Sequence, residues 1–282
     1  MREAGPSRTA LAVALSRALH QTLDRPLVFE DPFAARILGE RGRAAMAARG
    51  RSPLLGPILR ATLAVRCRVA EDTLQEAVAA GVRQYVVLGA GFDTFGLRNQ
   101  NPELQVIEVD HPNTQAWKRE TMKEEGLSVP PNLRFVPVDF TTQDLGTELR
   151  ATGLKEGEPA FFSWLGVVHY LEAAAIRRTL ATVASLSGAS GGVVFDFLAP
   201  PRPWQLLLRL IRWERGRRVA RLGEPFSDPL RPDEARRWLV EEGFADVQVL
   251  DPADLNARYL SGRTDRLRMS PLAYIAIAKG RR

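Results

Sequence analysis

The first 80 residues place apolar side chains at the spacing of amphipathic helices. One run recurs at intervals of three and four residues, the period of a helix with one buried face: Leu11, Ala14, Leu15, Ala18 and Leu19. Asp31-Pro32 predicts a second helix start, because proline suits the first helical turn. Residues 50–57 are predicted to form a loop. A longer helix is predicted from Ile58 to Ala80, before the helix-stop signal of Gly81.

From residue 84 onward, short continuous apolar runs alternate with helical stretches. Strands are predicted at 84–91, 104–110, 133–139, 159–166 and 192–198, with two closing strands at 244–250 and 273–279. Helices are predicted at 112–126, 172–186, 204–222 and 232–242. Continuous apolar strands that alternate with helices are typical of parallel βαβ units buried on both faces. We therefore predict one α/β domain, with a helical cap at 1–80, a core at 81–282 and a helical insertion at about 200–226.

Composition and charge narrow the class of protein only a little. The 282 residues are 45% hydrophobic and 26% charged, which argues against a disordered chain. No apolar run is long enough for a transmembrane helix, and the single Cys67 excludes an internal disulfide. The first residues show no signal-peptide pattern, so we expect a cytoplasmic protein. The formal net charge is +6, but arginines alternate with acids outside the dense stretch 209–221, so we expect neither a nucleic-acid nor a membrane partner.

A glycine turn, Gly89-Ala90-Gly91, ends the first predicted strand and is the most informative feature of the sequence. Its two glycines let the backbone turn sharply and leave no Cβ in the way of a ligand. Asp110 ends the next strand, 21 residues after Gly89, where an acid can accept hydrogen bonds from ribose hydroxyls. Asp139 ends the third strand. Because ligands of open parallel sheets bind beyond the carboxyl ends of the strands, this set predicts a nucleotide-like ligand.

The residues after the turn favour S-adenosyl-L-methionine over a dinucleotide. A dinucleotide fingerprint has a third glycine at the position that Thr94 holds here. Asp93 would repel a pyrophosphate at short range. S-adenosyl-L-methionine has no phosphate, and its sulfonium and ammonium groups suit a nearby carboxylate. We therefore predict this compound as the cofactor.

Several segments together resemble the leucine carboxyl methyltransferase-like family of class I S-adenosylmethionine-dependent methyltransferases, including its bacterial O-methyltransferase branch. They extend from about residue 7 to residue 250, and the clearest are Ser7–Ala10, Glu30–Ala34, Arg66–Arg68 with Asp72, Gly89–Arg98, Glu108–Pro112, Val136–Phe140 and Phe162–Leu171. The resemblance implies a Rossmann-like class I methyltransferase fold with a seven-stranded, mostly parallel sheet. The sequence departs from the family at Trp164-Leu165-Gly166, where some members carry a glutamate.

The resemblance also implies roles for individual residues. Asp110 would hold the cofactor ribose, and Asp139 and Phe140 would bracket the adenine. The glycine turn would let the backbone meet the methionine part of the cofactor. Arg66 would pair with the cofactor carboxylate, because a guanidinium fork matches a carboxylate, and Arg68 is the alternative.

The catalytic candidates depend on the methyl acceptor. A carboxylate is ionised at neutral pH and needs no base, whereas a phenol or alcohol benefits from one. His169 and Tyr170 follow the fourth strand at the edge where the cofactor is expected, and we predict them as the catalytic pair; alternatively, His169 shapes the pocket or caps a helix. His111 is expected to line the cofactor loop and His20 to lie on a helix surface. No metal-ligand spacing is evident, so no metal is predicted.

The insertion combines leucines with arginines. We predict a lid helix that packs its apolar face over the pocket. The alternatives are an arginine that attracts an acidic substrate, or a basic helix that touches a membrane or nucleic acid. Trp164, Trp204 and Trp213 are candidates to line an aromatic pocket, although a tryptophan at helical spacing more often belongs to a core.

These observations predict an S-adenosyl-L-methionine-dependent O-methyltransferase of secondary metabolism. Its acceptor is expected to be a carboxylate or hydroxyl of an anionic or aromatic small molecule. The alternatives are a protein C-terminal carboxyl methyltransferase, or a non-catalytic module that binds S-adenosylmethionine or nucleic acid. The sequence leaves the oligomeric state open.

Overall fold

The computed structural model describes residues 7–48, 56–140, 142–221 and 226–281. Within them, the strands are β1 (Gln84–Leu88), β2 (Gln105–Asp110), β3 (Leu133–Pro137), β4 (Ala160–Trp164), β5 (Gly192–Leu198), β6 (Phe244–Leu250) and β7 (Ala273–Arg281). The helices are α1 (Arg8–Leu23), α2 (Gly39–Ala48), α3 (Gly56–Ala79), α4 (Phe95–Arg98), α5 (Pro112–Glu124), α6 (Leu145–Ala151), α7 (Ala173–Ser187), α8 (Leu206–Arg221), α9 (Pro232–Glu241) and α10 (Pro252–Leu260). Two short 3₁₀ segments are η1 (Arg36–Leu38) and η2 (Val168–Tyr170).

The strands form one sheet in the order β3-β2-β1-β4-β5-β7-β6. The pairs from β3 to β5 are parallel, and β7 runs antiparallel to both of its neighbours. The predicted class, a seven-stranded and mostly parallel α/β sheet, is therefore confirmed. The strand order reverses between β1 and β4, and at such a point the connections leave toward opposite faces and open a crevice at the carboxyl ends.

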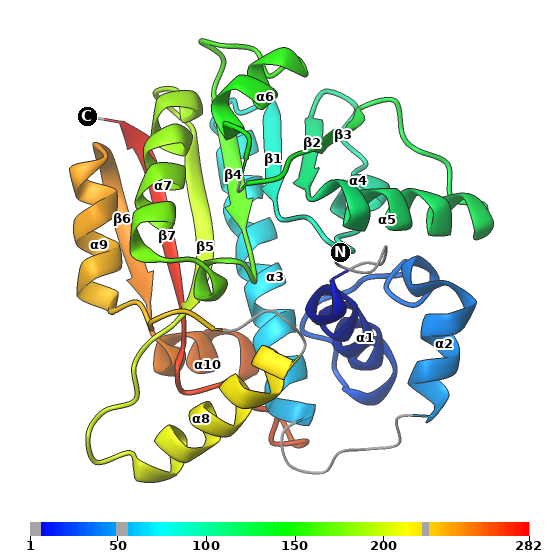
Figure 1. The fold of residues 1–282 in the computed structure, drawn as a ribbon, viewed down its shortest axis with the longest axis vertical. Coiled ribbons are helices and arrows are strands. Elements are labelled where there is room, and N and C mark those ends of the chain that lie inside the picture. Colours follow the sequence, from blue (N-terminus) through cyan, green and yellow to red (C-terminus); the bar gives the residue numbers. More distant parts are fainter. Residues whose placement is uncertain (1–6, 49–55, 141, 222–225, 282) are drawn as a thin grey trace.

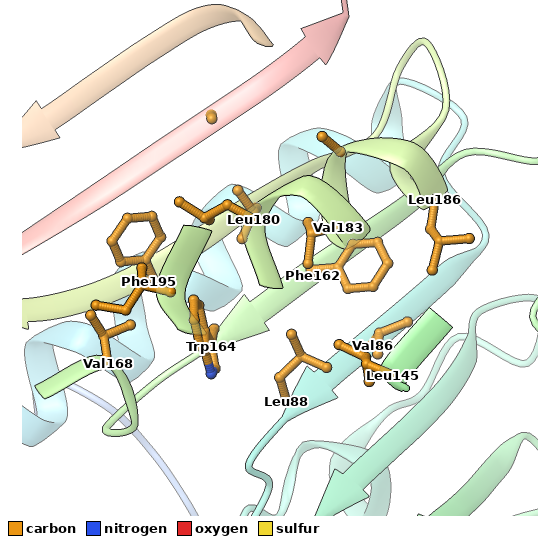
Figure 2. Close-up of a cluster of buried hydrophobic side chains, with 14 of the residues drawn as sticks. Val86, Leu88, Leu145, Phe162, Trp164, Val168, Leu180, Val183, Leu186 and Phe195 are labelled. Atoms are coloured by element: carbon orange, nitrogen blue, oxygen red, sulfur yellow. The ribbon is translucent and has the colours of Figure 1, made fainter. Parts of the chain in front are cut away.

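Helices cover both faces of this sheet (Figure 1). In β1, Val86 and Leu88 join the core beneath α6, α7 and α9, whereas Tyr85 and Val87 join the core beneath α3 and α10. Figure 2 shows the first of these cores, where Phe162 and neighbouring strand residues meet apolar side chains of α7. Successive strand residues point to opposite faces, so a strand buried on both faces must be apolar throughout. This explains the uninterrupted apolar run of β1.

The N-terminal segment forms a third cluster, in which α1 and η1 pack on α5 through residues such as Ala14, Ile37 and Met122. The prediction that a helix begins at Asp31-Pro32 was wrong. Residues 32–35 form a turn, and η1 and α2 follow it. Asp31 Oδ1 does accept from the backbone N–H of Phe33, as a helix cap would, at 3.1 Å. Its other oxygen accepts from the Thr94 hydroxyl at 2.7 Å, so Asp31 also ties this turn to the segment that follows β1.

The expectation that His20 lies on a helix surface was also wrong, because the residue is fully buried. Its Nε2 accepts from the backbone N–H of Val28 at 3.2 Å, so Nδ1 carries the proton and donates to Asp24 at 2.8 Å. Arg60 of α3 also pairs with Asp24, at 2.8 Å. Burial alone would raise the pKa of Asp24, but hydrogen bonds from Arg60 and His20 lower that pKa to about 2. This cluster ties α1 to α3.

The predictions of the longer helices are confirmed. The predicted helices at 58–80, 112–126, 172–186, 204–222 and 232–242 correspond to α3, α5, α7, α8 and α9. The short helices α6 and α10 were missed, although Asp144 and Asp251 each cap one of them by accepting from backbone N–H groups. Of the predicted loop at 50–57, residues 50–55 lie outside the described residues. None of the described helices is both long and apolar enough to cross a bilayer.

Candidate active site

A cavity of about 590 Å³ lies at the carboxyl ends of β1, β2 and β4. Its wall combines the glycine turn, the residues that follow β2 and β4, one turn of α3 and one side of α1. In Figure 1, α1 lies beside the sheet edge where these strands end. The cavity therefore occupies the crevice that the strand order creates, and the N-terminal cap closes one of its sides.

The glycine turn takes a backbone conformation that requires glycine. Gly89 and Gly91 have φ angles of 64° and 51°, in the left-handed region. A Cβ at Gly89 would come within 2.4 Å of Val167 Cγ2, so a side chain there would clash as well as strain the backbone. The backbone N–H of Ala90 donates to the Val109 carbonyl at 3.0 Å, which holds the turn against β2.

Asp110 ends β2 beside this turn. Its two carboxylate oxygens accept from backbone N–H groups, one from Gly91 and the other from His111 at 2.6 Å. Burial raises the pKa of Asp110 above its usual value, although both backbone hydrogen bonds counteract this effect. Asp110 therefore fixes the turn and presents an oriented acceptor to the cavity.

Arg66 of α3 lines the cavity beside Gly166, just after β4. Its Nη1 lies 3.1 Å from Asp196 Oδ2, and the other Asp196 oxygen accepts from the Gly166 N–H at 2.6 Å. Burial lowers the pKa of Arg66, but Asp196 outweighs this effect and holds that pKa above its usual value. The Arg66 Nε is buried and has no hydrogen-bond partner among the described residues. Arg66 lines the cavity, and a guanidinium at that place is suited to an anionic ligand group.

A second buried ion pair joins the cap to the glycine turn. Arg17 of α1 lines the cavity, pairs with Asp31 at 3.0 Å and donates to the backbone carbonyl of Phe92. Its Nη1 also lies 4.0 Å from the Asp93 carboxylate, which faces the cavity. Arg17 therefore holds α1 against the segment that follows the turn.

Three aromatic rings form another part of the wall. The His169 and Tyr170 ring centroids lie 4.3 Å apart, and Phe226 lies 5.4 Å from each of them. The backbone N–H of Ser227 donates to the His169 carbonyl at 3.0 Å and fixes the returning chain beside η2. The predicted catalytic pair thus faces the same cavity as the glycine turn.

Most of the predicted site residues lie in the cavity wall: Arg66, Gly89, Ala90, Gly91, Asp110, Phe140, His169 and Tyr170. Asp139 is half-buried just outside the wall. Arg68, the alternative to Arg66, points to the solvent side of α3 and pairs with Asp72 at 2.7 Å. Its side chain is 51% exposed, against 9% for Arg66, so of the two candidates only Arg66 lines the cavity among the described residues.

The described residues form neither the expected lid nor a tryptophan-lined pocket. Trp164 belongs to the core, whereas Trp204 and Trp213 are more than half exposed. The described side chains of α8 do not line the cavity. The prediction that this helix packs its apolar face over the pocket was therefore wrong.

Sequence reasoning missed Asp196, Arg17 and Phe226. Asp196 is the one charged residue of the apolar strand β5 and lies two residues before its end at Leu198, so an acid near the carboxyl end of a strand is a signal similar to that of Asp110. Arg17 and Phe226 carry no local signal, because only the tertiary fold brings α1 and the chain after α8 to the cavity. Cys67 also lines the cavity, but burial raises the pKa of its thiol to about 11, so it stays protonated at neutral pH. The described residues contain no cluster of three or more His, Cys, Asp or Glu side chains that could hold a metal ion.

The charges around the cavity fit a ligand that carries a carboxylate, an ammonium group and a ribose. The Arg66 guanidinium suits the carboxylate, and Asp93 and Asp110 suit the cationic and hydroxyl groups. A phosphate in the same place would face two carboxylates. S-adenosyl-L-methionine has the required groups and no phosphate, so the donor set fits it.

Known proteins are similar to this chain in sequence and in fold. The family described as leucine carboxyl methyltransferase matches residues 10–184. The S-adenosyl-L-methionine-dependent methyltransferase YktD of Bacillus subtilis is 30% identical, with 95% of each chain covered. A protein of Parafrankia sp. that is also named an S-adenosyl-L-methionine-dependent methyltransferase is 35% identical, over 68% of this chain and 63% of its own length. Among solved structures, a Thermobifida fusca methyltransferase aligns with a TM-score of 0.57 at 17% identity, covering 100% of this chain and 97% of that one.

These matches establish family, fold class and cofactor together. The family match covers more than half of the chain, and the YktD match extends over nearly all of it. The solved structure supports the Rossmann-like methyltransferase fold. The chain belongs to the leucine carboxyl methyltransferase family and is an S-adenosyl-L-methionine-dependent methyltransferase with a class I fold.

Proposed function

We propose that the protein transfers the methyl group to an oxygen atom of a small-molecule acceptor. The observation that carries this proposal is the cavity itself, where an imidazole and a phenol stand beside the turn expected to hold the cofactor. Its volume of about 590 Å³ lies in the range of small-molecule sites. A cavity closed on one side by α1 favours a small metabolite over a protein C-terminus.

In this proposal the cofactor is held by the residues of the cavity wall. Arg66 binds its carboxylate, Asp93 its ammonium group and Asp110 its ribose hydroxyls. Phe140 is 39% exposed and offers a ring face to the adenine. Asp139 stays a prediction for the adenine amino group, because its side chain lies outside the wall.

S-adenosyl-L-methionine supplies an electrophilic methyl group on its sulfonium. The protein must hold the acceptor oxygen in line with it and keep water out, and such positioning contributes several kcal/mol to the lowering of the barrier. Tyr170 and Phe226 provide apolar faces for an acceptor, and His169 is placed to take a proton from a hydroxyl. A carboxylate acceptor would need only the positioning.

A labelled-methyl screen tests the reaction. The full chain with labelled S-adenosyl-L-methionine would be incubated with carboxylates, phenols, alcohols, amines and thiols, and products identified by mass. We expect label in oxygen esters or ethers. A product labelled only on nitrogen, sulfur or carbon would refute the O-methyl proposal, and so would label only on a protein C-terminus.

Replacing His169 by alanine tests the base. With a hydroxyl acceptor, we expect kcat to fall by about 100-fold or more while KM changes little, because a positioned base typically contributes 10²–10⁴-fold. The remaining rate should rise with pH as the acceptor ionises in solution. Tyr170→Phe is the matched control, since it keeps the aromatic contact with the His169 ring and removes only the phenol hydroxyl. Unchanged turnover of His169→Ala would remove the base role and leave a shaping role.

A further inference from the structure

Helix α8 and the residues before it display the largest group of exposed apolar side chains in the described chain. Trp204, Leu206, Leu207, Leu210 and Trp213 have exposed fractions of 71%, 69%, 69%, 59% and 57%. Leu206, Leu210 and Trp213 are spaced four and three residues apart, so they share one face of the helix. Figure 1 shows α8, in yellow, beyond the edge of the sheet where β4 and β5 end. A patch of this kind marks an interaction site.

The same helix carries nearly all of the net charge of the protein. Residues 206–221 include six arginines and one glutamate, so their formal charge is +5, against +6 for the whole chain. The other residues of the chain are therefore almost neutral in sum. A strongly basic segment joined to exposed leucines and tryptophans combines the two attractions that hold an interfacial helix on a membrane.

Arginine side chains lie over both exposed tryptophans. The Arg202 guanidinium carbon lies 5.6 Å from the Trp204 ring centroid, and that of Arg217 lies 4.7 Å from the Trp213 centroid. Arg209 is also exposed, one helical turn before Trp213. Such pairs place a positive charge next to a ring that prefers the boundary between water and hydrocarbon. Lipid headgroups of negative charge complement this arrangement.

We propose that α8 docks the protein on an anionic lipid surface, lying in the interface with Leu206, Leu210 and Trp213 toward the acyl chains and with Arg217, on the same face, extending back to the headgroups. This proposal replaces our expectation from the sequence that there is no membrane partner, and it goes beyond the proposed function. A second copy of the chain is disfavoured, because pairing two +5 helices face to face is repulsive. Nucleic acid would engage the arginines but leave the leucines and tryptophans exposed to water.

Vesicle flotation of the full chain tests the proposal. We expect binding to vesicles of phosphatidylcholine mixed with phosphatidylglycerol, weak or no binding to phosphatidylcholine alone, and loss of binding as salt is raised. The variant Leu206→Ser/Leu210→Ser/Trp213→Ser should bind anionic vesicles at least tenfold more weakly. Arg209→Glu/Arg217→Glu should lose the preference for anionic lipid. Val129→Ser removes an apolar side chain that is 48% exposed elsewhere on the surface and is the matched control, expected to bind normally.

Several results would overturn the inference. The first is that equal amounts of protein float with neutral and with anionic vesicles, or that the protein floats with neither. Another is a triple variant that binds anionic vesicles as wild type does, because the apolar side chains would then not be inserted. Preferential binding of a DNA duplex over anionic vesicles would assign the helix to nucleic acid. A concentration-dependent dimer that the triple variant abolishes, without vesicle binding, would assign it to self-association. Methyl transfer in the absence of lipid gives an independent check that each variant is folded.

Discussion

Replacing Asp110 by alanine is expected to weaken the binding of S-adenosyl-L-methionine by at least tenfold, or about 1.4 kcal/mol. Two effects act together in this variant. The cofactor ribose loses its acceptor, and the Gly91 and His111 N–H groups lose the carboxylate that fixes the glycine turn. Calorimetric titration of the purified chain measures the affinity directly.

Asp139→Ala is a comparison variant, because Asp139 lies two residues after β3 on the same sheet edge but outside the cavity wall. We expect it to bind the cofactor more tightly than Asp110→Ala does. Asp110→Asn separates the two effects, since an amide oxygen can still accept from one of the backbone N–H groups. An Asp110→Ala variant that is folded and binds with unchanged affinity would show that the ribose lies elsewhere.

Replacing Arg17 by methionine is expected to lower the free energy of unfolding by about 3–5 kcal/mol, the usual cost of removing one partner of a buried ion pair. The Asp31 side chain is completely buried and lies 3.0 Å from Arg17 Nε. The Arg98 guanidinium is farther from Asp31, at 3.7 Å, so it replaces Arg17 only in part. Denaturant unfolding would measure the change, and thermal unfolding should show a midpoint lowered by several degrees or more.

A double variant separates charge from packing. Arg17→Met/Asp31→Asn should recover part of the lost stability, because it no longer leaves a buried carboxylate with too little positive charge beside it. Arg177→Met is the surface control: its pair with Glu241 is nearly half exposed, so its loss should hardly move the midpoint. If Arg17→Met unfolded at the wild-type denaturant concentration, the pair would not hold the cap to the core.

The sheet and the glycine turn could be predicted because their signals are local. A strand buried on both faces is continuously apolar, and a turn with positive φ angles at Gly89 and Gly91 needs glycine at those positions. Asp110 was found because it follows the turn at a characteristic distance along the chain. Each inference used residues of one short strand–turn–strand segment of the sequence.

Contacts between distant segments could not be predicted in the same way. Arg66 and Asp196 are 130 residues apart, and they meet because α3 packs on the face of the sheet that includes β5. His20 sits in an alanine- and leucine-rich helix, and nothing nearby indicates that Asp24 and Arg60 make its burial favourable.

Because α1 supplies part of the cavity wall, the stability of this helix should depend on whether a ligand occupies the cavity. Ala10, Val13 and Ala14 can contact a bound ligand only while α1 is docked, so binding and local unfolding of this helix are thermodynamically linked. Amide hydrogen exchange in α1 should therefore slow when the cavity is filled, whichever acceptor fills it. Exchange mass spectrometry of this one helix would then rank unlabelled candidate acceptors without any chemical turnover.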